Sequence, residues 1–464
     1  MTFPDQIFRE YDIRGVAERD LSDEVAEGVG RALCATLTKD GKAPRIAVGR
    51  DCRLSSPRLH AALLKGLVAQ GAHVIDIGIG PTPMLYFGVF HTNADGGVMI
   101  TGSHNPGNEN GFKMMKGKLS FFGPDIVALR DRIKAKDYPK AEAGQVEALD
   151  VQPAYVEEMK KRFDFSKMKK PKFVLDAGNG SGGPLGMMAM KALGLEPDAL
   201  FTDMDGRFPN HHPDPTVPKN LDALIDRVKK TGAQVGLAYD GDADRLGAVE
   251  PNGNIIWGDK LMILFARAVL KDNPGAAVIG EVKCSQTMYD DIAKHGGKPI
   301  IWKTGHSLIK TKMKETGALL AGEMSGHLFF ADRYYGYDDA IYAGLRLLEI
   351  IATDSRSITE MLADVPKTFA TPEIRVDCPD AIKFAVVAGI TKRYKAAGNT
   401  VLDIDGARIT FPSAGTAPKW GLVRASNTGP VLVMRVEAGT EAELEAVKAE
   451  LEGAVSEERA KLAG

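Results

Sequence analysis

One short pattern recurs three times along this chain: an apolar run that ends beside a glycine and an acidic residue, at 45–51, 172–178 and 276–281. Continuous apolar runs of this length are typical of strands that are covered on both faces of a sheet. After the first run, Ser56 can cap a helix that has Pro57 at its first position. Because strands and helices alternate in this way, we predict α/β layers with parallel or mixed sheets.

The C-terminal part of the chain follows a different pattern. Asp405 and Gly406 are typical of a hairpin turn, and residues 430–436 have the composition of a strand. Thr440 and Glu443 form a capping box for a final helix whose apolar residues share one face. These signals predict a smaller α+β unit at the C-terminal end.

The chain has 464 residues, which is too long for one core and predicts three or four domains. The fold class we expect is α/β, with three similar α/β domains plus a smaller C-terminal α+β domain. Breaks are expected at the polar stretch 141–151, at the turn 251–253 and at 365–368. The predicted domains are therefore residues 1–150, 151–253, 254–366 and 367–464.

Composition narrows the classes of function. No apolar run approaches the roughly 20 residues of a membrane helix, and the first residues lack the apolar core of a signal peptide. We therefore expect a cytoplasmic protein without a membrane partner. The net charge of −2 gives no reason to expect nucleic acid as a partner. The four cysteines form no CxxC pair, which favours reduced thiols over a zinc site.

A loop around Ser103 carries the first candidate for chemistry. A serine hydroxyl is a poor nucleophile unless it is activated or already modified. Gly102 lets the backbone turn and lets a bulky phosphoryl group approach, while His104 and Lys113 supply positive or proton-transferring groups nearby. The same residues also fit an ordinary Ser-Asn-Pro turn, and the chain has no G-x-S-x-G elbow.

The second candidate is the acidic loop, in which Asp240, Asp242 and Asp244 alternate after an apolar run. Alternate side chains of an extended segment share one face, and three carboxylates on one face repel one another unless a cation neutralises them. Hard oxygen ligands favour Mg²⁺ or Ca²⁺ over Zn²⁺. An EF-hand is excluded because Arg245 and Pro251 occupy its sixth and twelfth positions. A solvated acidic turn is the alternative, whereas a phosphoryl group on Ser103 would help complete the shell of a bound Mg²⁺.

Two further loops offer contacts for a ligand. Glu323, Ser325 and His327 also alternate, and this set of an acceptor, a hydroxyl and an imidazole can bind the hydroxyls of a sugar. Residues 424–429 combine an arginine, two hydroxyls and an amide, which makes a good anion cradle. Each loop can also be read as a simple connection, a Gly-flanked turn in the first case and a hairpin in the second.

A glycine-rich segment at 178–183 matches G-x-G-x-x-G, with Asp198 and Asp203 about twenty residues further on. A single match of this kind is weak evidence for a dinucleotide site. No other cofactor signature in the chain supports one, so we reject it.

Taken together, the chain resembles the α-D-phosphohexomutase superfamily, and within it the bacterial phosphomannomutase/phosphoglucomutase family. The resemblance spans nearly the whole chain in ordered, specific motifs. They lie at residues 8–15, 101–106, 110–113, 208–215, 240–245, 281–284, 302–307, 322–327 and 424–428.

The resemblance implies four domains around a central active-site cleft and reversible conversion of hexose 1-phosphate to hexose 6-phosphate, for mannose and glucose. The reaction would pass through a phosphoserine at Ser103 and a hexose 1,6-bisphosphate. It also implies one Mg²⁺ per chain, glucose 1,6-bisphosphate as activator, hexose phosphates as the small-molecule partners, and a monomer. The implied metal ligands are phospho-Ser103, Asp240, Asp242 and Asp244.

The same resemblance assigns roles to the remaining site residues. Glu323 and Ser325 match contacts to the sugar O3 and O4, which glucose and mannose share. The non-reacting phosphate would be gripped by Arg424, Ser426, Asn427 and Thr428. Cleft residues that contact substrate or assist proton transfer would be Tyr11, Arg14, Lys113, Arg245, Lys283, His306 and His327. We assign catalysis to Ser103, His104, Lys113, Arg14, Arg245 and His327, with Lys113 or His327 as the proton acceptor.

Three alternatives stay open at this point. A phosphoglucosamine mutase is one, although such enzymes usually carry Ser-Ala where this chain has Thr101 and Gly102. A phosphatase in which water attacks phospho-Ser103 is the second, and a non-catalytic sugar-phosphate-binding protein is the third. The acidic loop also departs slightly from the family, because Ala243 stands where glycine is usual.

Overall fold

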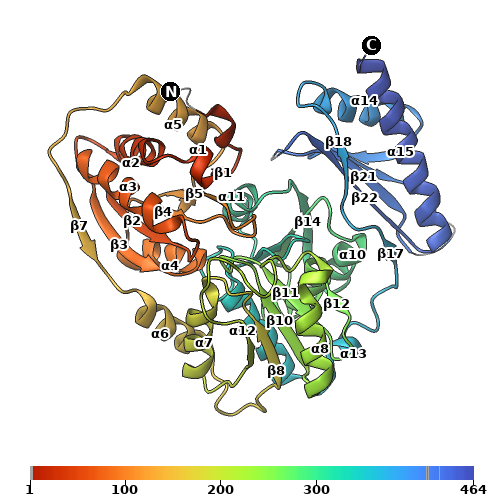
Figure 1. Cartoon of the computed structure of the whole chain (residues 1–464). Helices are drawn as coiled ribbons and strands as arrows, with labels where there is room; N and C mark the ends of the chain where they lie inside the picture. The colour runs from red at the N-terminus through yellow and green to blue at the C-terminus, as the bar shows by residue number, and fades with distance from the viewer. Residues whose placement is uncertain (1–3, 414, 416, 428, 464) are drawn as a thin grey trace.

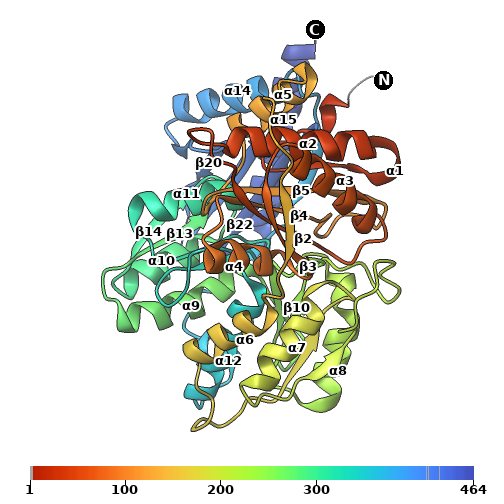
Figure 2. The ribbon, with the colours of Figure 1, turned by 90° about the vertical axis from the view of Figure 1, so that its left-hand side faces the viewer.

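The computed structural model describes residues 4–413, 415, 417–427 and 429–463. This part of the chain forms four sheets, each with its own helices (Figures 1 and 2). Within it, no helix combines the length and apolar character of a membrane span. The fold class predicted from the sequence is confirmed: three units are α/β, and the C-terminal unit is built on an antiparallel sheet.

The first unit has a sheet in the order β1-β5-β4-β2-β3-β7, with β6 beside β5. Its strands are β1 (Ile13–Val16), β2 (Arg45–Arg50), β3 (His73–Ile79), β4 (Gly96–Ile100), β5 (Glu109–Lys116), β6 (Leu119–Ser120) and β7 (Gln145–Ala148). Its helices are η1 (Asp5–Ile7), α1 (Ala17–Asp20), α2 (Asp23–Leu37), α3 (Ser56–Ala69), α4 (Thr82–Thr92) and α5 (Pro124–Ala135).

The second unit has the strand order β12-β11-β10-β8-β9. It consists of α6 (Gln152–Arg162), β8 (Phe173–Asp176), α7 (Gly182–Ala192), β9 (Asp198–Leu200), η2 (Pro218–Leu221), α8 (Asp222–Thr231), β10 (Val235–Tyr239), β11 (Leu246–Val249) and β12 (Ile255–Ile256). The third unit has the order β14-β13-β15-β16. It consists of α9 (Gly258–Asp272), β13 (Ala277–Glu281), α10 (Gln286–Lys294), β14 (Lys298–Trp302), α11 (His306–Thr316), β15 (Leu320–Gly322), β16 (Leu328–Phe330), α12 (Ala340–Thr353) and α13 (Ile358–Met361).

The three α/β units share one plan that places their loops. In each, parallel strands are followed by one antiparallel partner: β4 pairs with β5, β10 with β11, and β15 with β16. The serine loop, the acidic loop and the loop of Glu323 are the connections between these pairs. All three candidate loops therefore leave equivalent positions, at the carboxyl ends of parallel strands where ligands of such sheets bind.

The fourth unit is an antiparallel sheet in the order β17-β22-β21-β20-β19, with β18 beside β22. Its elements are β17 (Phe369–Ala370), β18 (Ile374–Asp377), α14 (Lys383–Ala396), β19 (Thr400–Leu402), β20 (Ala407–Thr410), β21 (Trp420–Ala425), β22 (Val431–Ala438) and α15 (Glu441–Ala463). The predicted cap of the last helix is present, because the Glu443 N–H donates to the Thr440 hydroxyl at 3.2 Å. The predicted cap at Ser56 is wrong, because its hydroxyl donates to Asp51 Oδ1 at 2.5 Å instead.

The apolar core is divided unevenly. One continuous buried cluster runs from Leu85 in the first unit through Leu237 in the second to Leu345 in the third. The fourth unit has its own cluster around Leu432, and Trp420 packs against the third unit. The first three units therefore share a core, whereas the fourth is a lobe with a core of its own that contacts the third unit (Figure 1).

Asp339 lies in the shared part of the core. Its carboxylate accepts hydrogen bonds from the hydroxyls of Tyr155 at 2.9 Å and Tyr334 at 2.8 Å, and from the backbone N–H of Tyr342 at 2.9 Å at the start of α12. Burial raises the pKa of Asp339 to about 6. The folded protein consequently binds a proton at this carboxylate more tightly than the unfolded chain does.

We expect Asp339→Asn to change how stability depends on pH. Since the folded pKa of Asp339 is raised, its contribution favours the folded state at low pH and declines as pH rises from about 4 to about 6, by at most about 3 kcal/mol. Wild type should gain stability relative to Asp339→Asn as pH falls from 7 to 4.5, as measured by urea unfolding. Asp226→Asn, on the exposed face of α8, is the control. A difference that is constant across this pH range would contradict the prediction.

Candidate active site

Ser103 is held in a conformation that few residues adopt. Its backbone is left-handed, with φ of 49°, and its N–H donates to the Thr101 hydroxyl at 2.8 Å. The side chain is buried, and its hydroxyl donates to Asp240 Oδ2 at 2.9 Å. The Oγ atom of Ser103 also lies 3.1 Å from Nδ1 of His104. The Ser103 hydroxyl of the serine loop thus contacts the acidic loop directly.

The acidic loop is folded around the carboxylate of Asp240. Its Oδ1 atom accepts the backbone N–H groups of Asp244 at 3.1 Å and Arg245 at 3.2 Å. Ala243 closes the turn with φ of 53°, which explains why glycine suits this position. Asp240, Asp242 and Asp244 are all fully buried.

These three carboxylates fit a metal ion. One ligand atom from each lies within 4.8 Å of the others. Within the described residues, Oδ1 of Asp242 and Oδ1 of Asp244 are buried and have no hydrogen-bond partner. Burial, with Asp244 and Asp242 close by, raises the pKa of Asp240 well above its ordinary value. A divalent cation would supply the missing partner for these oxygens and keep the set ionised, and all-oxygen ligands suit Mg²⁺.

Lys113 reaches into the acidic loop from β5. Its ammonium group lies 2.8 Å from Asp242 Oδ2 and 2.5 Å from Asp244 Oδ2. Burial by itself would lower the pKa of Lys113, but these carboxylates raise it well above its ordinary value. In this arrangement the carboxylates therefore favour the protonated form of Lys113.

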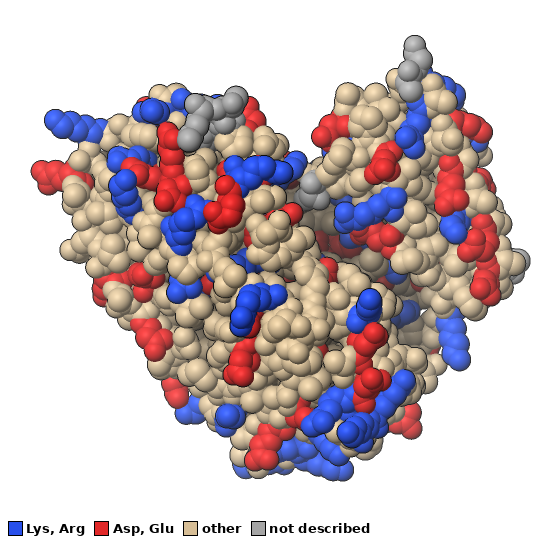
Figure 3. All heavy atoms as spheres, in the orientation of Figure 1, with Lys and Arg blue, Asp and Glu red and all other residues tan. Residues whose placement is uncertain are grey.

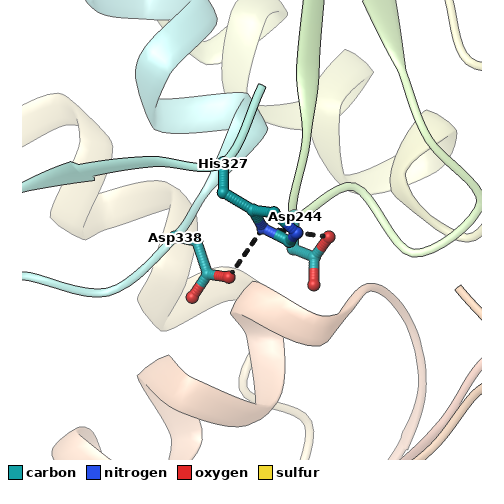
Figure 4. Close-up of side chains that lie close together, drawn as sticks. All are labelled: Asp244, His327 and Asp338. Atoms are coloured by element: carbon teal, nitrogen blue, oxygen red, sulfur yellow. Dashed lines mark ion pairs between the residues drawn. The ribbon is translucent and has the colours of Figure 1, made fainter. Parts of the chain in front are cut away.

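His327 faces the acidic loop from the third unit (Figure 4). The Nε atom of Arg245 donates to His327 Nε2 at 3.0 Å, and since an arginine N–H can only donate, Nε2 is the acceptor. The other ring nitrogen, Nδ1, lies 3.0 Å from Asp338 and 3.6 Å from Asp244. Asp338 is in turn paired with Lys310 at 3.0 Å. These contacts orient the imidazole at the edge of the carboxylate cluster.

Two more predicted residues surround the serine loop. Arg14 donates to the side chain of Asn105 at 2.8 Å and pairs with Asp12. His104 is buried close to Arg245 and Arg14. Burial, together with these two arginines, holds the pKa of His104 well below its usual range. His104 is therefore a neutral imidazole beside Ser103.

The third loop joins residues of the first and third units. Glu323 accepts the backbone N–H of Gly305 at 2.6 Å. His306 stacks on His327, with ring centroids 5.4 Å apart, and lies 6.0 Å from the ring of Tyr11. Ser325 is half-buried in the same turn as Glu323. The predicted sugar contacts thus adjoin the carboxylate cluster.

The fourth unit contributes from the opposite side. Arg424 pairs with Asp405 at 3.1 Å. The Asn427 side-chain amide donates to the hydroxyl of Tyr11 at 3.1 Å, and this hydroxyl donates to the Thr304 carbonyl at 2.9 Å. Residues of the first, third and fourth units therefore meet at Tyr11.

Lys283 and Ser426 lie near this junction. Lys283 pairs with Glu373 at 3.1 Å, and the carbonyl of Ser426 accepts from Lys383 at 2.6 Å. The predicted contact at Thr428 lies outside the described residues. The surface is hollowed between the fourth lobe and the rest of the molecule (Figure 3). Of the predicted phosphate-binding residues that are described, Asn427 reaches Tyr11 of the first unit.

Models of known protein domains match all four units of the chain. Models for the phosphoglucomutase/phosphomannomutase α/β/α domains I, II and III match residues 5–139, 153–253 and 257–369, and the C-terminal domain model matches residues 373–454. The chain belongs to the phosphoglucomutase/phosphomannomutase family. The resemblance noted in the sequence is therefore confirmed. The domain boundaries at 150, 253 and 366 stay predictions.

Several members of this family are similar along their full length. The chain is 46% identical to a phosphomannomutase/phosphoglucomutase of Pseudomonas aeruginosa, over 96% of this chain and 95% of the relative. It is 45% identical to a phosphoglucomutase of Neisseria gonorrhoeae, over 95% of each. A crystal structure of a family protein from Burkholderia thailandensis has a TM-score of 0.89 and 41% identity, covering 98% of this chain and 97% of the other.

Sequence reasoning missed two residues that contact the candidate site. Asp338, which faces His327, stands in a run of tyrosines and aspartates before α12 and gave no recognisable signal. Arg53 is remote from every motif we singled out but contacts the serine loop at four carbonyls. Its position between Asp51 and a helix start was the available hint.

Proposed function

We propose that this protein interconverts hexose 1-phosphates and hexose 6-phosphates of glucose and mannose, through a phosphoserine at Ser103 and a hexose 1,6-bisphosphate. The observation that carries the proposal is the Ser103 hydroxyl, 2.9 Å from Asp240 in a buried cluster of three carboxylates. The full-length similarity to relatives named phosphomannomutase/phosphoglucomutase supports the same activity.

The residues around Ser103 supply positions and charge. Asp240, Asp242, Asp244 and phospho-Ser103 would hold one Mg²⁺, which when bound would neutralise the oxygens of the transferring phosphoryl group. The bond from phosphorus to Ser103 Oγ breaks as a bond to O6 of the hexose 1-phosphate forms. Lys113, Arg14 and Arg245 stabilise negative charge during the transfer.

Proton transfer falls to His327 in this scheme. The substrate hydroxyl must lose its proton as it attacks, and Lys113 already holds one. The Nε2 atom of His327 is an acceptor oriented by Arg245 and Asp338, so it can take the proton once the substrate hydroxyl replaces Arg245 as its partner. Proton return to Ser103 restores the free hydroxyl.

The second half of the reaction reverses the first. The bisphosphate turns within the hollow, its 1-phosphoryl group moves to Ser103, and hexose 6-phosphate leaves. Glu323 and Ser325 contact O3 and O4, so both sugars are accepted. The non-reacting phosphate is gripped by Arg424, Ser426, Asn427 and Thr428, with Tyr11, Lys283 and His306 completing the contacts. Glucose 1,6-bisphosphate acts as activator by restoring phospho-Ser103.

Reorientation without escape requires the hollow to close over the intermediate, which fits a fourth lobe with its own core. We further propose that the chain works as a monomer, because the site residues in the described part come from all four units of one chain. We also propose that it works in the cytoplasm.

The direct test is conversion of glucose 1-phosphate and mannose 1-phosphate to their 6-phosphates, with Mg²⁺ and a trace of glucose 1,6-bisphosphate. We expect both sugars to be converted with kcat of about 10 s⁻¹ or more and within about tenfold of each other. Release of inorganic phosphate without 6-phosphate would identify a phosphatase. Conversion of glucosamine 1-phosphate alone would identify a phosphoglucosamine mutase, and no turnover of any of the three would favour a binding protein.

A further inference from the structure

The side chain of Arg53 contacts the backbone at several points along the serine loop. It lies after β2, and its side chain is fully buried. Its two terminal nitrogens donate to four backbone carbonyls, those of Ser103 at 2.7 Å, Asn105 at 2.7 Å, Pro106 at 2.6 Å and Glu109 at 2.8 Å. Buried carbonyls need donors, and here one planar guanidinium supplies them for the whole loop.

Asp51 completes the connection on the other side of the loop. One of its oxygens lies 3.2 Å from Arg53 Nε, and the same oxygen accepts the backbone N–H of Gly102 at 3.2 Å. The loop fits closely over the guanidinium, because a Cβ atom at Gly102 would lie 2.5 Å from Cζ of Arg53. Only glycine permits this approach immediately before Ser103.

The second unit covers the outer face of the same guanidinium. The Phe208 ring lies over Arg53, with its centroid 5.3 Å from Cζ. A Cβ atom at Gly206 would meet the backbone of Cys52 and Arg53 at 2.3 and 2.8 Å, so this turn packs directly on the residue. Arg53 therefore lies where the serine loop of the first unit meets the unit that carries the acidic loop.

We propose that Arg53 is a positioning residue for phosphoryl transfer: its guanidinium holds the left-handed backbone of Ser103 so that Oγ faces Asp240. Arg53 itself does not touch the transferring group. Its two terminal nitrogens and the contacts through Asp51 and Phe208 leave the loop a single arrangement. The inference rests on the proposed function, since it names what aligns the serine in that reaction.

The main test is Arg53→Lys, assayed with both hexose 1-phosphates. A lysine keeps the charge but has one compact ammonium group, which cannot serve four carbonyls in fixed directions. We expect kcat to fall on the order of 10²-fold, because small misplacements of reacting groups have effects of this size. KM should stay within about threefold, because the substrate contacts come from other loops. Intact mass should show that phosphorylation of dephosphorylated enzyme by glucose 1,6-bisphosphate slows in parallel.

Gly102→Ala approaches the same contact from the opposite side. It leaves Arg53 in place but pushes against its guanidinium, so we expect the same fall in kcat with little change in KM. The double variant should lose little more than either single variant, because both act on one contact. This second variant keeps the inference testable if Arg53→Lys does not fold.

Arg346→Lys is the matched control. Arg346 is also buried, pairs with Asp332 at 2.9 Å and lies over Phe330, but it belongs to α12 in the third unit. Its substitution should lower the thermal unfolding midpoint while kcat stays within about threefold of wild type. A general loss of a buried arginine is thereby separated from misplacement of Ser103.

Two outcomes would overturn the inference. One is a folded Arg53→Lys or Gly102→Ala variant with kcat and phosphorylation rate like those of wild type. The other is a fall in kcat that Arg346→Lys reproduces to the same extent. Absence of mutase activity in wild type would instead refute the proposed function, so the two failures are distinguishable.

Discussion

Replacement of Ser103 by alanine is expected to reduce conversion of both hexose 1-phosphates by roughly 10⁴-fold or more. The variant retains the loop but has no oxygen to carry the phosphoryl group to or from the substrate, and it loses the 2.9 Å contact to Asp240. Intact mass gives an independent readout. Wild type treated with glucose 1,6-bisphosphate should gain about 80 Da, and Ser103→Ala should gain nothing.

Ser22→Ala is the matched control for this experiment. Its hydroxyl caps α2 by accepting the N–H of Val25 at 3.3 Å, away from the active site. We expect a loss of about 1 kcal/mol in stability, with unchanged turnover and phosphorylation. Wild-type turnover or a phosphoryl mass gain in Ser103→Ala would exclude Ser103 as the carrier of the group.

Asp244→Asn tests whether the three carboxylates hold the metal. We avoid Asp240 because its side chain accepts the backbone N–H groups that shape the loop. The side chain of Asp244 contacts other side chains instead, those of Lys113 and His327. Removing one negative ligand should weaken Mg²⁺ binding on the order of tenfold or more. Turnover at moderate Mg²⁺ should fall on the order of 10²-fold, and a higher concentration should restore part of it.

Calorimetry and thermal unfolding measure this binding without reference to activity. Mg²⁺ should raise the unfolding midpoint of wild type, and a chelator should reverse the shift and abolish turnover. Asp339→Asn removes another buried carboxylate outside the cluster and should bind Mg²⁺ like wild type. Unchanged Mg²⁺ affinity in Asp244→Asn, or full turnover of wild type in chelator, would place the metal elsewhere or remove it from the reaction.

Much of the fold was predictable because local patterns and tertiary structure agree. The first apolar run became β2, a strand covered on both faces, and residues 430–436 lie almost entirely in β22. Ser56 shows the limit of such reasoning. Its hydroxyl is a good cap by local rules, but Asp51 lies closer and accepts it instead. A partner that another loop brings near can override a local preference.

In the site too, some residues could be predicted from local patterns, whereas others depend on contacts that only the structure shows. Ser103 and the aspartates of the acidic loop could be picked out by residue type and spacing, and the structure brings them together. The sequence left Lys113 and His327 as alternative proton acceptors. The two carboxylates beside Lys113 favour its protonated form, and this contact supports our proposal that His327 takes the proton. Asp338 and Arg53 were missed because neither belongs to a motif that we could read, and Arg53 also contacts a loop about fifty residues further along the chain.

The sequence by itself determined the fold class, the family and the chemical groups of the three loops, because these depend on periodicity and on residue types at short spacing. The tertiary structure alone decided that Ser103 meets Asp240, that His327 lies between Arg245 and Asp338, and that Arg53 holds the serine loop. Apart from the pair of His327 and Asp338, these contacts join residues 50 to 137 positions apart. Their geometry depends on how three sheets with one plan pack around a shared core, which no local pattern encodes.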